Sequence, residues 1–193
     1  MSDFQHTMVV GGTGMLFDLS VELARRSDVL TSIALAEDSL ARLSAALAPG
    51  SGRHHAVAVD YTRTEAFTAA VAESIRLNGP VALAVGWFRD DGAAFAFARA
   101  LGEQQAPVRF FHVLGSTAAD PEASLARVRP PFEDLRRISY HSVILGFVPG
   151  EGGSRWLSHA EICAGVREAI ARSSREHVVG SVRPWSSRPH TSS

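Results

Sequence analysis

The sequence contains no lysine, because all 19 basic residues of the 193-residue chain are arginine. This absence excludes Schiff-base chemistry, a Walker-type phosphate lysine and any tyrosine acid that a lysine assists. Cys163 is the only cysteine. It excludes an internal disulfide and a cysteine-based metal cage, and its surroundings are typical of a helix core. Since no pair of histidines has convincing zinc spacing, we expect no metal.

Long apolar runs and clustered positive charge are also missing. No stretch approaches the roughly 18 apolar residues that a membrane-spanning helix requires. The net charge is −1 and the chain has no basic run, so we expect neither nucleic acid nor membrane as a partner. The start, Met1 to His6, has neither a basic region nor a small-residue cleavage site. We therefore expect no secretory signal and a cytoplasmic protein.

The chain instead alternates short apolar runs with longer helical patterns. Unbroken apolar runs such as 81–85 are typical of parallel strands that helices cover on both faces. The pattern predicts an α/β fold: a doubly wound, Rossmann-like domain over residues 1–184 with a mostly parallel sheet of about seven strands, and a flexible tail over 185–193. Predicted strands are 7–10, 30–36, 56–59, 81–85, 108–114, 140–148 and 177–182, and predicted helices start near residue 16 and cover 39–47, 64–77, 93–101 and 158–173.

A glycine-rich turn, Gly11-Gly12-Thr13-Gly14, joins the first strand to the first helix. Glycines allow a tight turn and the close approach of a pyrophosphate, which the N–H groups at the helix start attract. The turn therefore predicts a nucleotide site, although it could also serve only to connect strand and helix. Counted from Gly12, the third glycine of G-x-G-x-x-G is Phe17, whose bulk is expected to hold helix and strand apart.

With this turn the chain resembles the short-chain dehydrogenase/reductase superfamily, particularly atypical members that carry Gly-Gly-Thr-Gly-Met-Leu. The resemblance covers about residues 7–182 and implies a Rossmann fold with NAD or NADP bound by Gly11, Gly12, Thr13, Gly14, Met15 and Leu16.

The resemblance also implies an adenine contact at Asp60 and Tyr61 after the third strand. Asp60 could instead cap the turn before the third helix. Gly86 and Trp87 stand where the family has Asn-Asn-Ala-Gly. Their backbone would contact a cofactor ribose, while the Trp87 ring would either line a pocket or cover the sheet.

The end of the second strand bears on cofactor choice. An acidic residue there hydrogen-bonds the adenosine ribose and disfavours a 2′-phosphate. Glu37 lies 23 residues after Gly14, close to the usual spacing. This favours NAD over NADP. In the alternative interpretation, Glu37 is solvated and Asp38 or Ser39 caps the second helix.

The catalytic part departs from the family pattern. Ser116, just after the fifth strand, resembles the family's catalytic serine, but the Tyr-x-x-x-Lys motif is missing because Tyr140 is followed by Ile144. Of the two tyrosines, Tyr140 is nevertheless the one that we expect to transfer the proton. Arg155 is one candidate for the nearby cation that this tyrosine would need. A tyrosine without a nearby cation is a weak acid near pH 7. Candidate alternatives are three histidines: His112, expected in the core, His141, facing opposite Tyr140, and His159, expected at the surface.

These residues support two hypotheses. The first is an atypical NAD(P)-dependent oxidoreductase for a small carbonyl, imine or alcohol, with the substrate near Arg155, Trp156 and His141. In the alternative interpretation, residues 152–158 form a connection capped by Ser158, with Trp156 packed on the core. The second hypothesis is a non-catalytic nucleotide-binding protein that acts as a sensor, regulator or partner subunit. The apolar stretch 93–98 would offer a homodimer contact.

Overall fold

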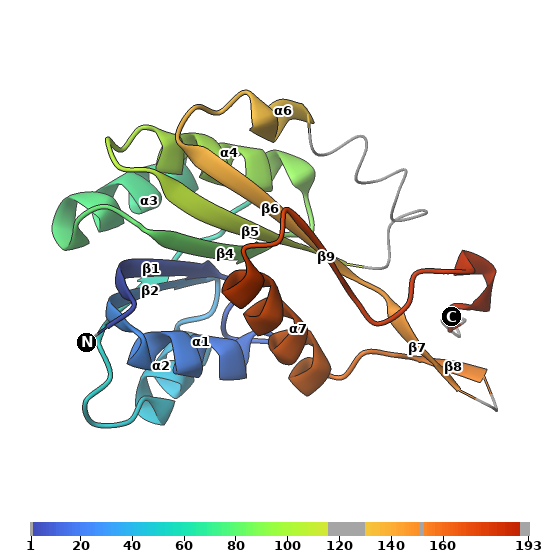
Figure 1. Ribbon diagram of the computed structural model, residues 1–193. Coiled ribbons are helices and arrows are strands. Elements are labelled where there is room, and N and C mark those ends of the chain that lie inside the picture. The colour runs from blue at the N-terminus through green and yellow to red at the C-terminus, as the bar shows by residue number, and fades with distance from the viewer. Residues whose placement is uncertain (1, 116–129, 151–152, 190–193) are drawn as a thin grey trace.

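The computed structural model describes residues 2–115, 130–150 and 153–189. Within these ranges seven strands form one sheet, in the order β3-β2-β1-β4-β5-β6-β9, and every neighbouring pair is parallel (Figure 1). The predicted α/β class and doubly wound parallel sheet are confirmed. The strands are β1 (Phe4–Val10), β2 (Ser27–Ala34), β3 (Arg53–Ala58), β4 (Leu83–Trp87), β5 (Val108–Leu114), β6 (Ile138–Leu145) and β9 (Glu176–Val179).

Helices cover both faces of this sheet (Figure 1). On one face lie α1 (Phe17–Arg25), α2 (Glu37–Ala46) and α7 (His159–Arg172), and on the other lie α3 (Thr64–Asn78), α4 (Asp91–Gly102) and the short α6 (Pro130–Glu133). Each face has its own apolar core. Double coverage explains why the strands carry unbroken apolar runs. No helix in the described ranges is both long and apolar enough to cross a membrane.

The chain after β6 differs from the prediction. Instead of a strand to residue 148 and a glycine-rich loop, a hairpin of β7 (Phe147–Gly150) and β8 (Gly153–Trp156) follows β6. Gly146 lies between β6 and β7, and a Cβ there would lie 2.2 Å from the Ser181 carbonyl oxygen. Because this close backbone approach leaves no room for a side chain, the chain leaves the sheet at Gly146.

Two further predictions concern surfaces. The stretch predicted as a tail begins with a 3-10 helix, Trp185–Ser187, whose Trp185 ring lies 6.3 Å from that of Phe147. In the stretch 93–98, Ala93, Ala94, Phe97 and Ala98 are buried within the chain, so they offer little to a second copy. A flexible tail and a homodimer both stay predictions.

Candidate functional site

A cleft of about 380 Å³ opens at the carboxyl ends of β1, β2 and β4. The strand order reverses between β1 and β4, and in doubly wound sheets ligands bind outside the carboxyl ends of the strands at this reversal. A larger groove of about 470 Å³ lies on the outer surface of α3 and α4, away from the strand ends. Its position gives no comparable reason to expect a ligand, so we place the candidate site at the strand-end cleft.

The glycine turn forms one wall of this cleft through Gly11, Thr13, Gly14 and Met15. Gly11 has φ +77°, which favours glycine. A Cβ placed on Gly14 would meet no atom within 4 Å, so the space above Gly14 is open. Within the described ranges, the N–H groups of Thr13, Gly14 and Met15 donate to no acceptor. Unpaired N–H groups beside a helix start are suited to a phosphate.

Gly12 has a different role from Gly14. A Cβ on Gly12 would lie 2.4 Å from Ser20 Oγ and 2.7 Å from Val9 Cγ1, and the Ser20 hydroxyl donates to the Gly12 carbonyl oxygen at 3.0 Å. Strand and helix therefore approach each other closely at this point. Phe17 does not hold them apart as predicted, because its partly exposed ring faces the Arg42 guanidinium, whose Cζ is 5.8 Å away.

The end of β2 and the loop after β3 form a second wall. Leu35 is 71% exposed although it is a large apolar residue, and it lines the cleft together with Tyr61. The Tyr61 ring is fixed from behind by edge contacts to Phe67 and Phe88, at centroid distances of 6.4 and 5.5 Å. An apolar wall of this kind suits a flat ring such as adenine.

The two predicted acidic residues lie beside this wall. Asp60 accepts hydrogen bonds from the N–H and hydroxyl of Thr62, at 2.9 and 2.7 Å, which lower the pKa of its carboxyl. Asp60 thus stabilises the turn before α3, the alternative that the sequence left open. Glu37 is exposed in the first turn of α2. The N-cap of that helix is Ala36, with no side-chain cap, so neither Asp38 nor Ser39 caps it.

Arg42, which the sequence analysis did not single out, also reaches the glycine turn. Its guanidinium donates to the Thr13 carbonyl oxygen at 3.1 Å. The side chain is exposed. A cation is therefore held one turn of α2 beyond Glu37, close to the wall that would receive a phosphate.

Gly86 and Trp87 end β4, and their roles differ. A Cβ on Gly86 would lie 2.3 Å from the Phe88 ring, so Gly86 makes room for aromatic packing. Trp87 lines the cleft and is partly buried. Its ring lies beside both Gly11 and Gly115, since a Cβ on either glycine would be 3.7 or 3.6 Å from it. The indole thus reaches from the glycine turn to the end of β5.

Leu16 and Tyr140 are buried away from the cleft. Leu16 is fully buried in the core under α1. Tyr140 pairs with Phe110, four residues before the end of β5, and its ring stacks on Phe132 at 4.3 Å. Its hydroxyl lies 3.0 Å from Nδ1 of His112, and burial lowers the pKa of that imidazole to about 3. As expected, His112 is a core residue, and among described residues neither it nor Tyr140 lines the cleft.

The predicted substrate residues are also engaged elsewhere. His141 stacks on Phe111 at 4.4 Å, on the sheet face opposite Tyr140, and donates to the Ser174 carbonyl oxygen at 2.8 Å. Arg155 forms two hydrogen bonds with Glu161, at 2.8 and 2.9 Å, which together with Ser158 lower the pKa of Glu161 to about 2.

Trp156 pairs with Phe147 in the hairpin. Neither Trp156, Arg155 nor His141 is among the described residues that line the cleft. Ser116 lies outside the described residues.

The sequence did not indicate that His159 lies at the cleft. This residue was expected at the surface, and it is exposed, but it also lines the cleft. It is the first residue of α7, directly after Ser158, whose hydroxyl forms a capping box with Glu161. Its role depends on how α7 lies against α1, which no local pattern predicts.

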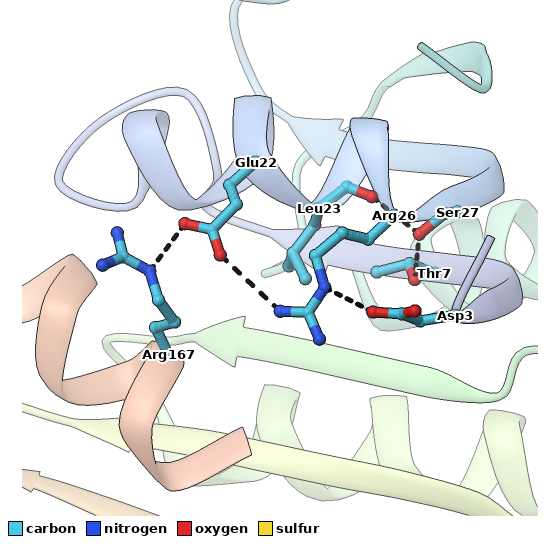
Figure 2. A network of polar contacts seen from close by, with 7 residues as sticks. All are labelled: Asp3, Thr7, Glu22, Leu23, Arg26, Ser27 and Arg167. Carbon is cyan, nitrogen blue, oxygen red and sulfur yellow. Dashed lines mark hydrogen bonds and ion pairs between the residues drawn. The ribbon is translucent and has the colours of Figure 1, made fainter. Parts of the chain in front are cut away.

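Two contacts hold α7 beside α1 and the glycine turn. The Cys163 thiol donates to the Met15 carbonyl oxygen at 3.2 Å. The Arg167 guanidinium donates to Glu22 of α1 at 2.6 Å, and Figure 2 shows Glu22 between Arg167 and Arg26, which in turn pairs with Asp3 at 2.7 Å. The start of α7, with His159, is therefore held over one end of the cleft.

No protein-family model and no curated protein matches the sequence. Solved structures do match the fold. A short-chain dehydrogenase from Oenococcus oeni superposes with a TM-score of 0.72 at 13% identity, covering 93% of this chain and 96% of that one. A short-chain dehydrogenase/reductase from Serratia marcescens gives 0.71 at 16% identity, with coverage of 92% and 96%. An NAD⁺-bound xylitol dehydrogenase gives 0.57 at 14%, with coverage of 76% and 72%. The chain therefore has the Rossmann-like fold of the short-chain dehydrogenases/reductases.

Proposed function

We propose that the chain is an NAD(P)-dependent oxidoreductase of the atypical short-chain dehydrogenase/reductase type, acting on a small carbonyl, imine or alcohol. The observation that carries this proposal is the open glycine turn in the cleft at the strand reversal. Gly14 has free space above it, and the N–H groups of Thr13, Gly14 and Met15 have no acceptor among the described residues.

The residues along the cleft suit successive parts of such a dinucleotide. Leu35 and Tyr61 offer apolar surfaces for adenine, the glycine turn offers N–H groups for the diphosphate, and the Trp87 indole offers a flat surface at the far end. A bound nicotinamide would supply or accept the hydride. The chain's own residues would bind and orient it, and Ser116, which resembles the family's catalytic serine, is the residue that we propose to polarise the substrate oxygen.

NAD is the cofactor that we propose, on the ground of Glu37. An exposed carboxylate at the start of α2 is suited to the adenosine ribose and repels a 2′-phosphate. Arg42 is the opposing feature, because its guanidinium beside Thr13 would attract a phosphate. Measuring the affinity of the protein for NAD and for NADP decides which of these two side chains sets the preference.

The test is isothermal titration of NAD, NADH, NADP and NADPH into the purified protein and into Gly14→Asp. We expect micromolar binding of a cofactor to the wild type and a loss of at least about 100-fold in the variant, since a carboxylate would enter the phosphate space. A circular dichroism melt provides the control, because the open space at Gly14 predicts an unchanged fold. Absence of binding by all four cofactors would contradict the proposal.

The second candidate, a nucleotide-binding protein without catalysis, is favoured by one observation. Tyr140 is tied to buried His112, and the sequence has no lysine to activate a tyrosine. The two candidates are separated by adding a panel of aldehydes, ketones, imines and enones to the cofactor complex and following nicotinamide absorbance. Turnover supports the oxidoreductase. A complex that transfers no hydride to any of them supports the binding protein.

A further inference from the structure

The proposed reduction needs a proton for the substrate oxygen, and of the residues predicted to give it, His159 is the one among the described residues that line the cleft. The Tyr140 ring lies in the core against Phe132, and His141 stacks on Phe111. Among the described residues that line the cleft, only Tyr61 and His159 carry an ionisable side chain.

Tyr61 is placed at the wrong end for this task. It lies with Leu35 beside β2 and β3, where adenine is expected, and its hydroxyl accepts a long hydrogen bond from the Arg89 N–H at 3.4 Å. His159 comes from α7, which packs against α1 and faces Met15 of the glycine turn. It lines the cleft from α7, which is held beside Met15 of the glycine turn.

The imidazole of His159 is available to a ligand. Within the described ranges it has no hydrogen-bond partner, in contrast to His6, His112 and His141, which all have one. It is exposed, so solvent can return a proton to it. Its backbone is fixed, because the Ser158–Glu161 capping box and the Arg155–Glu161 ion pair hold the first turn of α7.

We infer that His159 is the proton donor of this cleft. This inference rests on the proposed function. A bound reduced nicotinamide would supply the hydride for the new C–H bond at the carbonyl carbon, and the π electrons of the C=O bond would pass to oxygen. A ring N–H of protonated His159 gives its proton to that oxygen, which leaves neutral imidazole and an alcohol. Water then reprotonates the ring. A histidine is suited to this because it changes protonation near neutral pH without help from a lysine.

The first experiment locates His159 without relying on turnover. The ring signals of ¹⁵N-histidine-labelled protein are recorded by NMR with and without the cofactor identified by titration, and His159→Ala assigns the signal. We expect the His159 ring signal to shift on saturation with cofactor, while the signal of His177 in β9, whose Nε2 lies 3.8 Å from Glu168 of α7, stays in place. Tight cofactor binding with an unmoved His159 signal would overturn the inference but not the proposed function. Absence of cofactor binding would overturn both.

The second experiment tests the proton. In the carbonyl assay, His159→Ala should lower kcat about 100-fold while the Kd of the cofactor changes less than threefold, as expected for loss of a general acid. Added imidazole should restore part of the rate, and His177→Gln should behave like the wild type. Unchanged kcat in His159→Ala, or a loss that imidazole does not rescue, would overturn the role. A wild type that binds cofactor but reduces no carbonyl would overturn the oxidoreductase proposal as well.

Discussion

At the amino end of the sheet, His6 and His55 have partners within the protein, whereas several polar groups of the carboxyl-end cleft have none in the described ranges. At the amino end, the buried His6 ring contacts the Gly79 carbonyl oxygen and the Thr31 hydroxyl, each at 2.8 Å, and His55 lies 2.8 Å from the Asn78 amide nitrogen. At the carboxyl end, the N–H groups of Thr13, Gly14 and Met15 and the His159 ring have no partner within the described ranges. Polar groups that pair with one another stabilise the fold, whereas those left open beside a cleft are free to bind a ligand.

The same contrast exists inside the glycine turn. Gly12 is required by the packing of α1 on β1, and Gly14 faces open space. We expect Gly12→Val to lower the free energy of unfolding by about 3 kcal/mol, because its side chain would overlap Ser20 and Val9. Gly14→Val should change it by about 0.5 kcal/mol or less while blocking the cofactor. Urea unfolding of both variants measures the difference, and equal losses of stability would contradict the division of roles.

The next largest expected effect is the contribution of His112 to the pH dependence of stability. Burial lowers the pKa of its imidazole to about 3, below the ordinary histidine value of 6.5. The unfolded chain then binds a proton that the folded protein does not, so stability is full above pH 6.5 and falls as the pH drops towards 3. Between pH 7.5 and pH 5 the expected loss from this residue is about 2 kcal/mol.

His112→Gln isolates this contribution. His6 and His55 also have pKa values lowered mainly by burial, but they contribute equally to the wild type and the variant. Urea unfolding at the two pH values should therefore show a fall that is about 2 kcal/mol larger in the wild type. The same fall in both proteins would mean that the His112 imidazole is protonated within the fold.

The fold was predictable because its determinants are local. Runs such as Val108–Leu114 indicate strands covered on both faces, and the glycine turn lies between a strand and a helix in the sequence itself. Alternation along β6 also placed Tyr140 and His141 on opposite faces, and the structure confirms this, since one stacks on Phe132 and the other on Phe111.

How far a residue lies from the carboxyl end of the sheet cannot be predicted from its local sequence. Tyr140 is far from the cleft because it pairs with Phe110 rather than with the last residue of β5, a register that the pattern of either strand leaves open. His159 is in the cleft because of contacts between residues far apart in sequence, such as Cys163 with Met15. Leu35 was placed inside the predicted strand 30–36, whereas in the structure it directly follows β2, which ends at Ala34.

The smallest expected effect is the difference in affinity between NAD and NADP. Two side chains of α2, Glu37 and Arg42, are compared for their part in it. If Glu37 meets the adenosine ribose, NAD should bind the wild type about tenfold more tightly than NADP, a difference of about 1.4 kcal/mol. Glu37→Gln should remove most of this preference, because it removes the negative charge that repels a 2′-phosphate. Arg42→Gln is the matched control and should leave NAD affinity within about twofold, since the Arg42 guanidinium is held by the Thr13 carbonyl. Isothermal titration of both cofactors measures all three proteins. Tighter binding of NADP by the wild type, lost in Arg42→Gln, would assign cofactor recognition to Arg42 in place of Glu37.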